Sequence, residues 1–366
     1  MRVDWDALIA EASALGFDAI GAAPAEPSRY GTQFRAWLAL GRNGPMAWLE
    51  RDPERRIDPR LVHPTARSII VVTMRHDLPP AGPVPLDVPR GRIASYAVGE
   101  DYHEIMTPRL RALAERIGDP LARAYVDTGP VLERSAAEAA GLGWIGRNCN
   151  LIVPGQGSFT FLGVLLSSLE TPPPRPGTIS CGRCTACLVA CPTGALIGPS
   201  QMDARRCIST LTIETRGMLA ETDRPLIGDW VYGCDLCQEA CPWNRKATGT
   251  REPALKALAD RLYPSLDEIL GLDAAGFSVR FRRSAIKRTK REGLARNAAV
   301  VLGNSDHKDA AAVLERHQAH DLPVVRAHVA WALGRHRAGR VLLRMRSREP
   351  DALVTAEIDR ALLGIR

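Results

Sequence analysis

Eight of the nine cysteines in this sequence lie between residues 181 and 241, at spacings that suit iron–sulfur chemistry. The first group reads Cys181-x2-Cys184-x2-Cys187-x3-Cys191-Pro192, which is the ligand pattern of bacterial two-cluster ferredoxins. In that pattern three thiolates bind one 4Fe–4S cluster and the fourth, before proline, binds the neighbouring cluster. The sequence therefore predicts two 4Fe–4S clusters.

The second cysteine group is incomplete on its own. It reads Cys234-x2-Cys237-x3-Cys241-Pro242, with no cysteine shortly before Cys234, so one ligand has to come from elsewhere. The solitary Cys207 is the candidate. We assign the thiolates to two sets of four: Cys181, Cys184, Cys187 and Cys241 for the first cluster, and Cys191, Cys207, Cys234 and Cys237 for the second.

Structural zinc and disulfides are the alternatives for these cysteines. Zinc sites use paired Cys-x2-Cys knuckles, and a third cysteine at the same spacing followed by Cys-Pro fits tetrahedral zinc poorly. Disulfides would need a secreted chain, and the N-terminus carries no export signal. The ninth cysteine, Cys149, is most simply a small buried apolar residue.

The composition and the N-terminus indicate an ordinary cytoplasmic protein. The 366 residues are 45% hydrophobic and 24% charged, and the longest mostly apolar run, Phe159 to Leu169, is too short to span a membrane. Residues 1–16 predict an amphipathic helix that stops at Gly16, without the basic and apolar segments of a signal peptide. We expect a cytoplasmic chain with no membrane association.

The first 170 residues mix strand and helix patterns. Short apolar runs rich in β-branched residues predict buried strands at 68–74, 124–127 and 159–166. Helical periodicity occupies the intervening stretches 102–117 and 131–140. Alternation of this kind predicts an α/β sandwich in this part of the chain.

Two proline-rich segments divide the sequence further. The segment 79–89 predicts an irregular surface loop, and 171–177 predicts a stiff connector that leads into the cysteine-rich region. We therefore expect an α+β protein with three domains: an α/β sandwich at 1–171, a ferredoxin-like domain at 172–247, and an all-α domain at 248–366.

The C-terminal domain shows an internal repeat. The stretch Leu294–Gly303 is echoed by Val325–Gly334, and the two glycines are 31 residues apart. That period suits helical hairpins of the HEAT type. Because only two units are visible, they cannot form a free solenoid and are expected to dock on the cluster domain.

The strongest charge run in the protein precedes this repeat, and the net charge of the chain is +7. Its basic residues are Arg280, Arg282, Arg283, Lys287, Arg288, Lys290 and Arg291. A solvated helix face is the simplest explanation. Because the run contains almost no acid and adjoins the repeat, contact with a phosphate backbone is favoured.

Asp127 is the strongest candidate for proton chemistry. It ends a predicted strand and precedes the turn Thr128-Gly129-Pro130, and a carboxylic acid there could deliver a proton into a pocket. An aspartate that caps the helix beginning near Pro130 explains it equally well. His103 is open between a helix-surface residue and a site residue. No Gly-x-Gly-x-x-Gly follows a predicted strand and no Walker A sequence is present, so electrons from the clusters need another acceptor.

Over nearly its whole length the chain resembles the epoxyqueuosine reductases, which catalyse the last step of queuosine biosynthesis. The resemblance rests on Arg56-Ile-Asp-Pro59, Glu100-Asp-Tyr-His103, Val126-Asp-Thr-Gly-Pro-Val-Leu-Glu-Arg134, Gly141-Leu-Gly-Trp-Ile-Gly-Arg-Asn-Cys149, the cysteine pattern with Cys207-Ile-Ser209, and Arg296-Asn297. The family is similar in its cofactors to reductive dehalogenases, but those respiratory enzymes are usually exported.

The resemblance implies an oxidoreductase that deoxygenates epoxyqueuosine to queuosine at the wobble position of tRNA, a two-electron reduction. Cob(I)alamin fed by the two 4Fe–4S clusters would drive it, with Asp127 as proton donor. The implied cobalamin contacts are Arg56, Ala94, His103, Asp127, Leu151, Val153, Leu162, Ser209 and Asp235. The candidate tRNA contacts are Arg216, Arg296 and Asn297, together with Lys287, Arg288, Lys290 and Arg291 of the basic run. An external low-potential electron donor and a monomeric enzyme are also implied.

One absence bears on the cofactor. Enzymes that ligate cobalt from below with histidine carry Asp-x-His-x-x-Gly, whereas Asp101-x-His103 is followed by Met106 at the glycine position. We therefore expect base-off cobalamin, which is easier to reduce. A dehalogenase-like enzyme, a simple electron carrier and a tRNA-binding scaffold with structural clusters remain the rival interpretations.

Overall fold

The computed structural model describes residues 4–79, 82–171, 177 and 179–365. The chain divides into two compact units, and each draws on several separate stretches of sequence. The first unit contains Met1–Pro79, Gly99–Arg205 and Asp235–Lys256. The second contains Pro80–Val98, Arg206–Cys234 and Ala257–Arg366. The three domains predicted from the sequence stay a prediction. None of the described helices has both the length and the apolar character needed to cross a membrane.

The first unit combines helices and short strands. Its α-helices are α1 (Trp5–Ala14), α2 (Gly31–Ala39), α3 (Pro53–Ile57), α4 (Tyr102–Arg116), α5 (Glu133–Ala139), α6 (Ala186–Ala190) and α8 (Leu236–Glu239). Its strands are β1 (Ala19–Pro24), β2 (Ser68–Arg75), β4 (Arg123–Tyr125), β5 (Trp144–Ile145), β6 (Leu151–Ile152), β7 (Thr160–Ser167), β8 (Leu196–Gly198) and β9 (Gln201–Met202). The mixed α/β character predicted from the sequence is confirmed.

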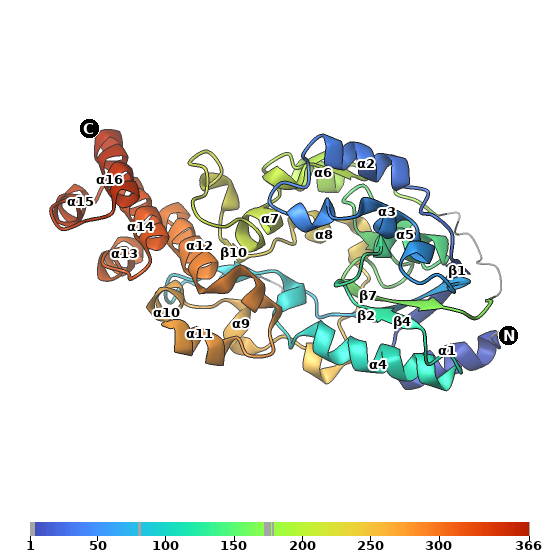
Figure 1. Ribbon diagram of the computed structural model, residues 1–366. Coiled ribbons are helices and arrows are strands. Elements are labelled where there is room, and N and C mark those ends of the chain that lie inside the picture. The colour runs from blue at the N-terminus through green and yellow to red at the C-terminus, as the bar shows by residue number, and fades with distance from the viewer. Residues whose placement is uncertain (1–3, 80–81, 172–176, 178, 366) are drawn as a thin grey trace. The chain divides into compact units, whose positions relative to one another are not determined.

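A four-stranded antiparallel sheet forms the centre of this unit, in the order β1-β2-β7-β4. Every residue of β2 is buried, which explains its continuous apolar sequence, because a strand covered on both faces has no polar side. Figure 1 shows α1 and α4 along one face of the sheet and α3 and α5 along the other. The strands predicted at 68–74, 124–127 and 159–166 are confirmed to within two residues.

The two faces of the sheet have separate cores. On one face Val71, Val164 and Leu166 pack with the alanines of α5. The other face is covered by α4, whose Met106 and Leu110 are fully buried. Asp101 caps α4 by accepting a hydrogen bond from the His103 N–H. The sheet and its two helical layers therefore fix the ends of α4 and β4, where the candidate site lies.

The second unit is largely helical. Its elements are β3 (Arg92–Ile93), α7 (Ile208–Ile213), β10 (Trp230–Tyr232), α9 (Ala259–Leu262), α10 (Leu266–Gly271), α11 (Ala274–Arg280), α12 (Lys290–Asn304), α13 (Ala310–Arg316), α14 (Pro323–Arg335), α15 (Gly339–Arg346) and α16 (Ala352–Ile365). Short 3-10 turns include η8 (Ala285–Thr289), and β3 pairs with β10 in parallel.

The repeated glycines mark where successive long helices approach each other most closely. A Cβ atom at Gly303 of α12 would lie 2.6 Å from the Trp331 ring of α14, and one at Gly334 of α14 would lie 2.8 Å from Ala361 of α16. Helix α12 packs on α14, and α14 packs on α16. The 31-residue period therefore reflects a repeated close helix contact.

The two proline-rich segments differ in how far they can be described. Residues 82–89 form no helix or strand, as predicted. Most of the predicted connector at 171–177 lies outside the described residues.

Candidate active site

The four cysteines assigned to the first cluster come together in the first unit. Cys187 lies on α6 and is buried, and Cys241 follows α8 and is buried too. Burial raises the pKa of Cys187, and the neighbouring thiols of Cys241 and Cys181 raise it further. Burial likewise raises the pKa of Cys241, and the nearby thiols of Cys181 and Cys184 raise it further. These mutual effects show that the four thiols are close enough to influence one another.

Aromatic side chains support this cysteine group. The Trp144 indole donates a hydrogen bond to Cys181 Sγ at 3.3 Å, and Trp144 packs with Ile152 and Cys241. Within the described ranges, no three His, Cys, Asp or Glu side chains are close enough to share one metal ion. A 4Fe–4S cluster does not need three side chains around one metal ion, because each thiolate binds a different iron atom.

The four cysteines assigned to the second cluster are divided between the units: Cys191 and Cys237 belong to the first, Cys207 and Cys234 to the second. The pKa of Cys191 is lowered, because the nearby Thr193 hydroxyl and backbone N–H groups outweigh the opposing effect of burial. A thiol that ionises readily suits a metal ligand. The assignment of the second set stays a prediction.

Asp127 occupies a strained turn directly after β4. Its φ of 57° is left-handed, a conformation uncommon outside glycine but better tolerated by Asp and Asn. Its N–H donates to Glu133 Oε1 at 2.7 Å, and its Oδ2 accepts from the Tyr102 hydroxyl at 3.0 Å. Helix α5 begins at Glu133, and no side chain caps it. The alternative role of Asp127 as a helix cap is therefore wrong.

Tyr102 is held rigidly beneath this carboxylate. Its ring stacks on Phe161 of β7 with centroids 4.0 Å apart and planes 9° apart. The neighbouring His103 ring stacks on its other side at 4.0 Å. His103 Nδ1 lies 2.7 Å from Asp101 Oδ1, and because a carboxylate only accepts, Nδ1 is the donor in this hydrogen bond. His103 is partly exposed in the first turn of α4, beside the site.

Arg56 and Glu133 complete the charged surroundings of Asp127. Arg56 donates to the carbonyls of Gly129 and Trp48, both at 3.3 Å, while its buried Nε has no partner among the described residues. Burial lowers the pKa of Arg56. Burial also raises the pKa of Glu133 to about 8, and the charge of Asp127 adds to this effect. At neutral pH this carboxylic acid therefore retains its proton.

The raised pKa of Glu133 predicts a pH-dependent loss of stability. Its pKa moves from 4.5 in a free side chain to about 8 in the folded chain, so the folded state holds the proton more tightly. The stability that the folded state gains from this tighter proton binding is fully present below pH 4.5 and is lost as the pH rises through about 8. Replacing Glu133 with Gln, which keeps the acceptor for the Asp127 N–H, should abolish it. Urea unfolding of both proteins between pH 5 and pH 8.5 should show wild type losing stability relative to the variant; a constant difference would contradict the prediction.

The other predicted cofactor contacts are distributed over both units. Leu151 and Val153 are buried in the core on the α5 face of the sheet, and Leu162 packs against that core. Leu151 and Val153 therefore offer a ligand only their backbone. Asp235, also in the first unit, is buried and accepts from the Gln238 amide at 3.3 Å. Ala94 and Ser209 belong to the second unit.

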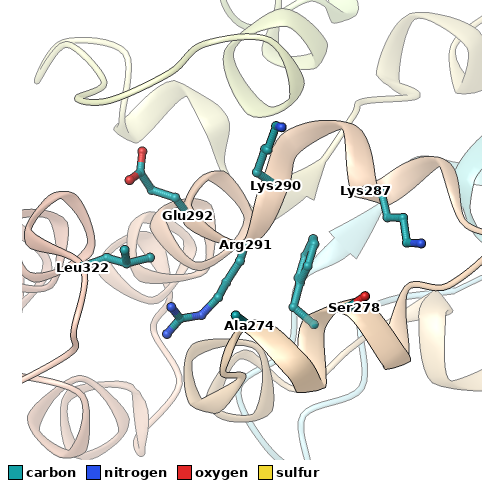
Figure 2. Close-up of a pocket in the computed structure, with 8 residues that line it drawn as sticks. Ala274, Ser278, Lys287, Lys290, Arg291, Glu292 and Leu322 are labelled. Atoms are coloured by element: carbon teal, nitrogen blue, oxygen red, sulfur yellow. The ribbon is translucent and has the colours of Figure 1, made fainter.

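The basic run extends from the end of α11 through the 3-10 turn η8 into the first turn of α12. Lys287, Arg288 and Lys290 are exposed, and Arg288 pairs with Glu214 at 2.7 Å. Lys287, Lys290, Arg291 and Glu292 are among the residues that line a depression of about 480 Å³. Figure 2 draws their side chains. Arg291 forms a two-pronged ion pair with Asp321, whose pKa it lowers to about 2. Among the described residues, Lys287 and Lys290 form no ion pair, so their charges are available to an anion.

Two predicted tRNA contacts have a different role. The side chains of Arg296 and Asn297 on α12 are fully buried. Arg296 donates to the carbonyls of Leu211, Thr215 and Gly217, and Asn297 donates to those of Thr212 and Val231. Neither side chain has surface for a nucleic acid, which corrects the prediction. Arg216 remains exposed, and it donates to the Arg288 and Thr289 carbonyls.

Sequence reasoning did not single out Tyr102 or Glu133. Both lie in motifs already noted, Glu100–His103 and Val126–Arg134, but the sequence does not show that α4 and α5 bring them to the same turn. The one signal in the sequence that could have identified them is their chemistry, an aromatic hydroxyl and an acid within these two motifs.

The cysteine set and the mixed α/β scaffold define an iron–sulfur redox protein. A family model described as "4Fe-4S double cluster binding domain" matches residues 180–244. A second, "Epoxyqueuosine reductase QueG, DUF1730", matches residues 56–128 and so includes Arg56, His103 and Asp127.

Whole-chain comparisons agree. The epoxyqueuosine reductase of Xanthomonas campestris pv. campestris is 41% identical over 329 residues, 88% of this chain and 93% of that protein. A crystal structure of epoxyqueuosine reductase with an epoxyqueuosine-modified tRNA-Tyr stem loop has a TM-score of 0.89 at 30% identity, covering 98% of both chains. The Bacillus subtilis enzyme, solved with its catalytic aspartate loop swung out of the active site, has a TM-score of 0.89 at 29% identity and covers 99% of this chain and 98% of that one. The chain belongs to the epoxyqueuosine reductase family and is a reductase.

Proposed function

We propose that this enzyme removes the epoxide oxygen of epoxyqueuosine in tRNA in a two-electron reduction, with Asp127 as the acid. The observation that carries the proposal is the Asp127 turn, whose carboxylate is exposed and fixed by Tyr102 while its backbone is fixed by Glu133. The Bacillus subtilis enzyme, described with its catalytic aspartate loop swung out of the active site, supports the assignment.

The residues present fit the implied cofactors. Two sets of four thiols suit two 4Fe–4S clusters, and the mutual electrostatic effects among Cys181, Cys184, Cys187 and Cys241 support the first set. The unpartnered, buried Nε of Arg56 beside Asp127 suits a polar group of base-off cobalamin. We propose that the cobalamin is also contacted by His103, Leu162, Asp235, the backbone of Leu151 and Val153, and Ala94 and Ser209. When bound, cobalamin would supply the low-potential redox chemistry.

The protein itself supplies orientation and a proton. Loss of the epoxide oxygen as water requires two electrons and two protons, and Asp127 is the exposed acid at the site. The Tyr102 hydrogen bond aims its carboxyl group, and Glu133 holds a proton nearby at neutral pH. Arg56 places a positive charge beside both carboxyl groups.

We propose that the exposed basic residues Lys287, Arg288 and Lys290, with Arg216 and Arg291 beside them, contact the tRNA backbone. The relative solved with a tRNA stem loop supports a tRNA partner for this chain. The repeated close contacts of α12, α14 and α16 support HEAT-like hairpins as the platform. A cytoplasmic, monomeric enzyme served by an external low-potential electron donor completes the proposal.

Replacing Lys287 and Lys290 together with Gln should weaken tRNA binding and flatten its salt dependence. Each lost phosphate contact should lower the slope of log K against log salt by about 0.7–0.9. Filter binding of an anticodon stem loop at several salt concentrations measures this slope. The matched control is the Arg335→Gln, Arg337→Gln double variant, which removes the same charge at the end of α14. An unchanged slope in the Lys287/Lys290 variant would remove these lysines from the interface.

The function as a whole is tested on anaerobically purified protein supplemented with cobalamin. About eight irons and one five-coordinate, base-off Co(II) per chain are expected, from two clusters and one corrinoid. The loaded enzyme should convert epoxyqueuosine-containing tRNA to the queuosine form, detected by nucleoside mass spectrometry. Eight irons without corrinoid uptake or turnover would leave an electron carrier and contradict the proposal.

A further inference from the structure

The first cluster site lies at the protein surface. Cys184 is exposed, and so is the whole loop 182–185 that carries it. The four cysteines of the second set are each only partly exposed. Because electrons from outside must enter at an accessible cluster, the first set is the entry point.

The surface around this loop is basic. Arg183 lies in the loop itself, and Arg147, from the turn between β5 and β6, donates to the Gly182 carbonyl at 2.9 Å. Arg245 and Lys246 follow Cys241 by a few residues and are exposed. Within the described part of the chain none of these four cations forms an ion pair, and residues 179–200 contain no acid. Glu239 of α8 is the exposed acid nearest to them in sequence.

Apolar side chains are exposed on the same elements. Val189, between Cys187 and Cys191 on α6, is 83% exposed. Trp243 is 39% exposed, and its ring packs edge-on against Trp144 at 4.8 Å, next to Cys181. Apolar contacts bordered by charges of one sign are typical of a small transient protein interface. The entry face consists of Arg147, Arg183, Val189, Trp243, Arg245 and Lys246.

We infer that the entry face is the docking site of a small acidic one-electron carrier protein that reduces the first cluster. The inference rests on the proposed function, because it assumes that the clusters carry electrons. Each encounter moves one electron from the reduced carrier to the oxidised cluster, and no bond forms or breaks. Two encounters supply the two electrons of the deoxygenation. Complementary charge speeds such encounters and orients them.

The test uses holoenzyme and two acidic carriers, flavodoxin and a 2Fe–2S ferredoxin. The Arg183→Glu, Lys246→Glu double variant reverses two charges of the entry face. The Arg111→Glu, Arg123→Glu double variant makes the same charge change on α4 and β4. Calorimetric titration with oxidised carrier at low salt should show roughly tenfold weaker binding by the first variant and a flatter salt dependence. The control should bind as wild type does.

Two further measurements separate this inference from the proposed function. Turnover with dithionite-reduced methyl viologen should stay unchanged in both double variants, because a small reductant needs no docking site. The inference would be overturned if the two variants lost carrier affinity equally, or if neither carrier showed salt-sensitive binding to wild type. Loss of tRNA affinity in the Arg183/Lys246 variant would also overturn it. Absence of turnover with the small reductant in wild type would instead contradict the proposed function.

Discussion

An enzyme with Asn in place of Asp127 should bind tRNA and cofactors normally but turn over about 10²- to 10⁴-fold more slowly, because general acid catalysis contributes about this factor. Asn is the most suitable replacement for the left-handed turn, since it tolerates positive φ and its side-chain oxygen can still accept from Tyr102. The substitution therefore removes the proton while keeping the geometry. Single-turnover kinetics with epoxyqueuosine-containing stem loop measure the effect.

Tyr102→Phe is the matched control for this prediction. It removes the hydrogen bond to Asp127 but keeps the stacking on Phe161, so only positioning is lost. One neutral hydrogen bond contributes about 0.5–1.5 kcal/mol, which corresponds to a rate loss of about tenfold at most. Equal activity of the Asp127→Asn variant and wild type would exclude Asp127 as the acid.

Replacing Asn297 with Ala should lower the free energy of unfolding by about 3 kcal/mol, because leaving one buried polar group without its partner costs about 1–3 kcal/mol. The Asn297 amide donates to the carbonyls of Thr212 and Val231, and its oxygen accepts from the Arg296 guanidinium. The variant leaves the buried Arg296 charge with fewer acceptors. Burial already lowers the pKa of Arg296 to about 10, which shows how costly its charge is in this position.

Asn304→Ala provides the control on the same helix. The Asn304 amide also donates to two carbonyls, those of Arg224 and Gly228, but the residue is only partly buried, so water can replace the lost bonds. A loss below about 1 kcal/mol is expected. Urea unfolding followed by intrinsic tryptophan fluorescence, to which the buried Trp230 and Trp331 contribute, compares the variants. Similar losses for Asn297 and Asn304 would show that the buried network contributes little.

The sequence by itself determined the redox chemistry and several of the elements. Cysteine spacing is set by local chain geometry around a cluster, so Cys181, Cys184 and Cys187 could be assigned to one site before any fold was known. Strand β2 was predictable because burial on both faces makes its sequence continuously apolar. The close approach of α12 to α14 was visible as the echo of Gly303 in Gly334.

Only the tertiary structure decided which side chains surround Asp127 and which basic residues are available to a ligand. Tyr102 reaches Asp127 from α4, 25 positions earlier in the chain, and Glu133 reaches it from the start of α5, six positions later. Neither contact follows from a spacing pattern in the sequence. The family resemblance made Arg296 and Asn297 candidate tRNA contacts, and charged or polar side chains are expected at the surface unless partners satisfy them. The carbonyls that satisfy them come from residues 211–231, which are 66 to 85 positions away, and this pairing exists only in the folded chain.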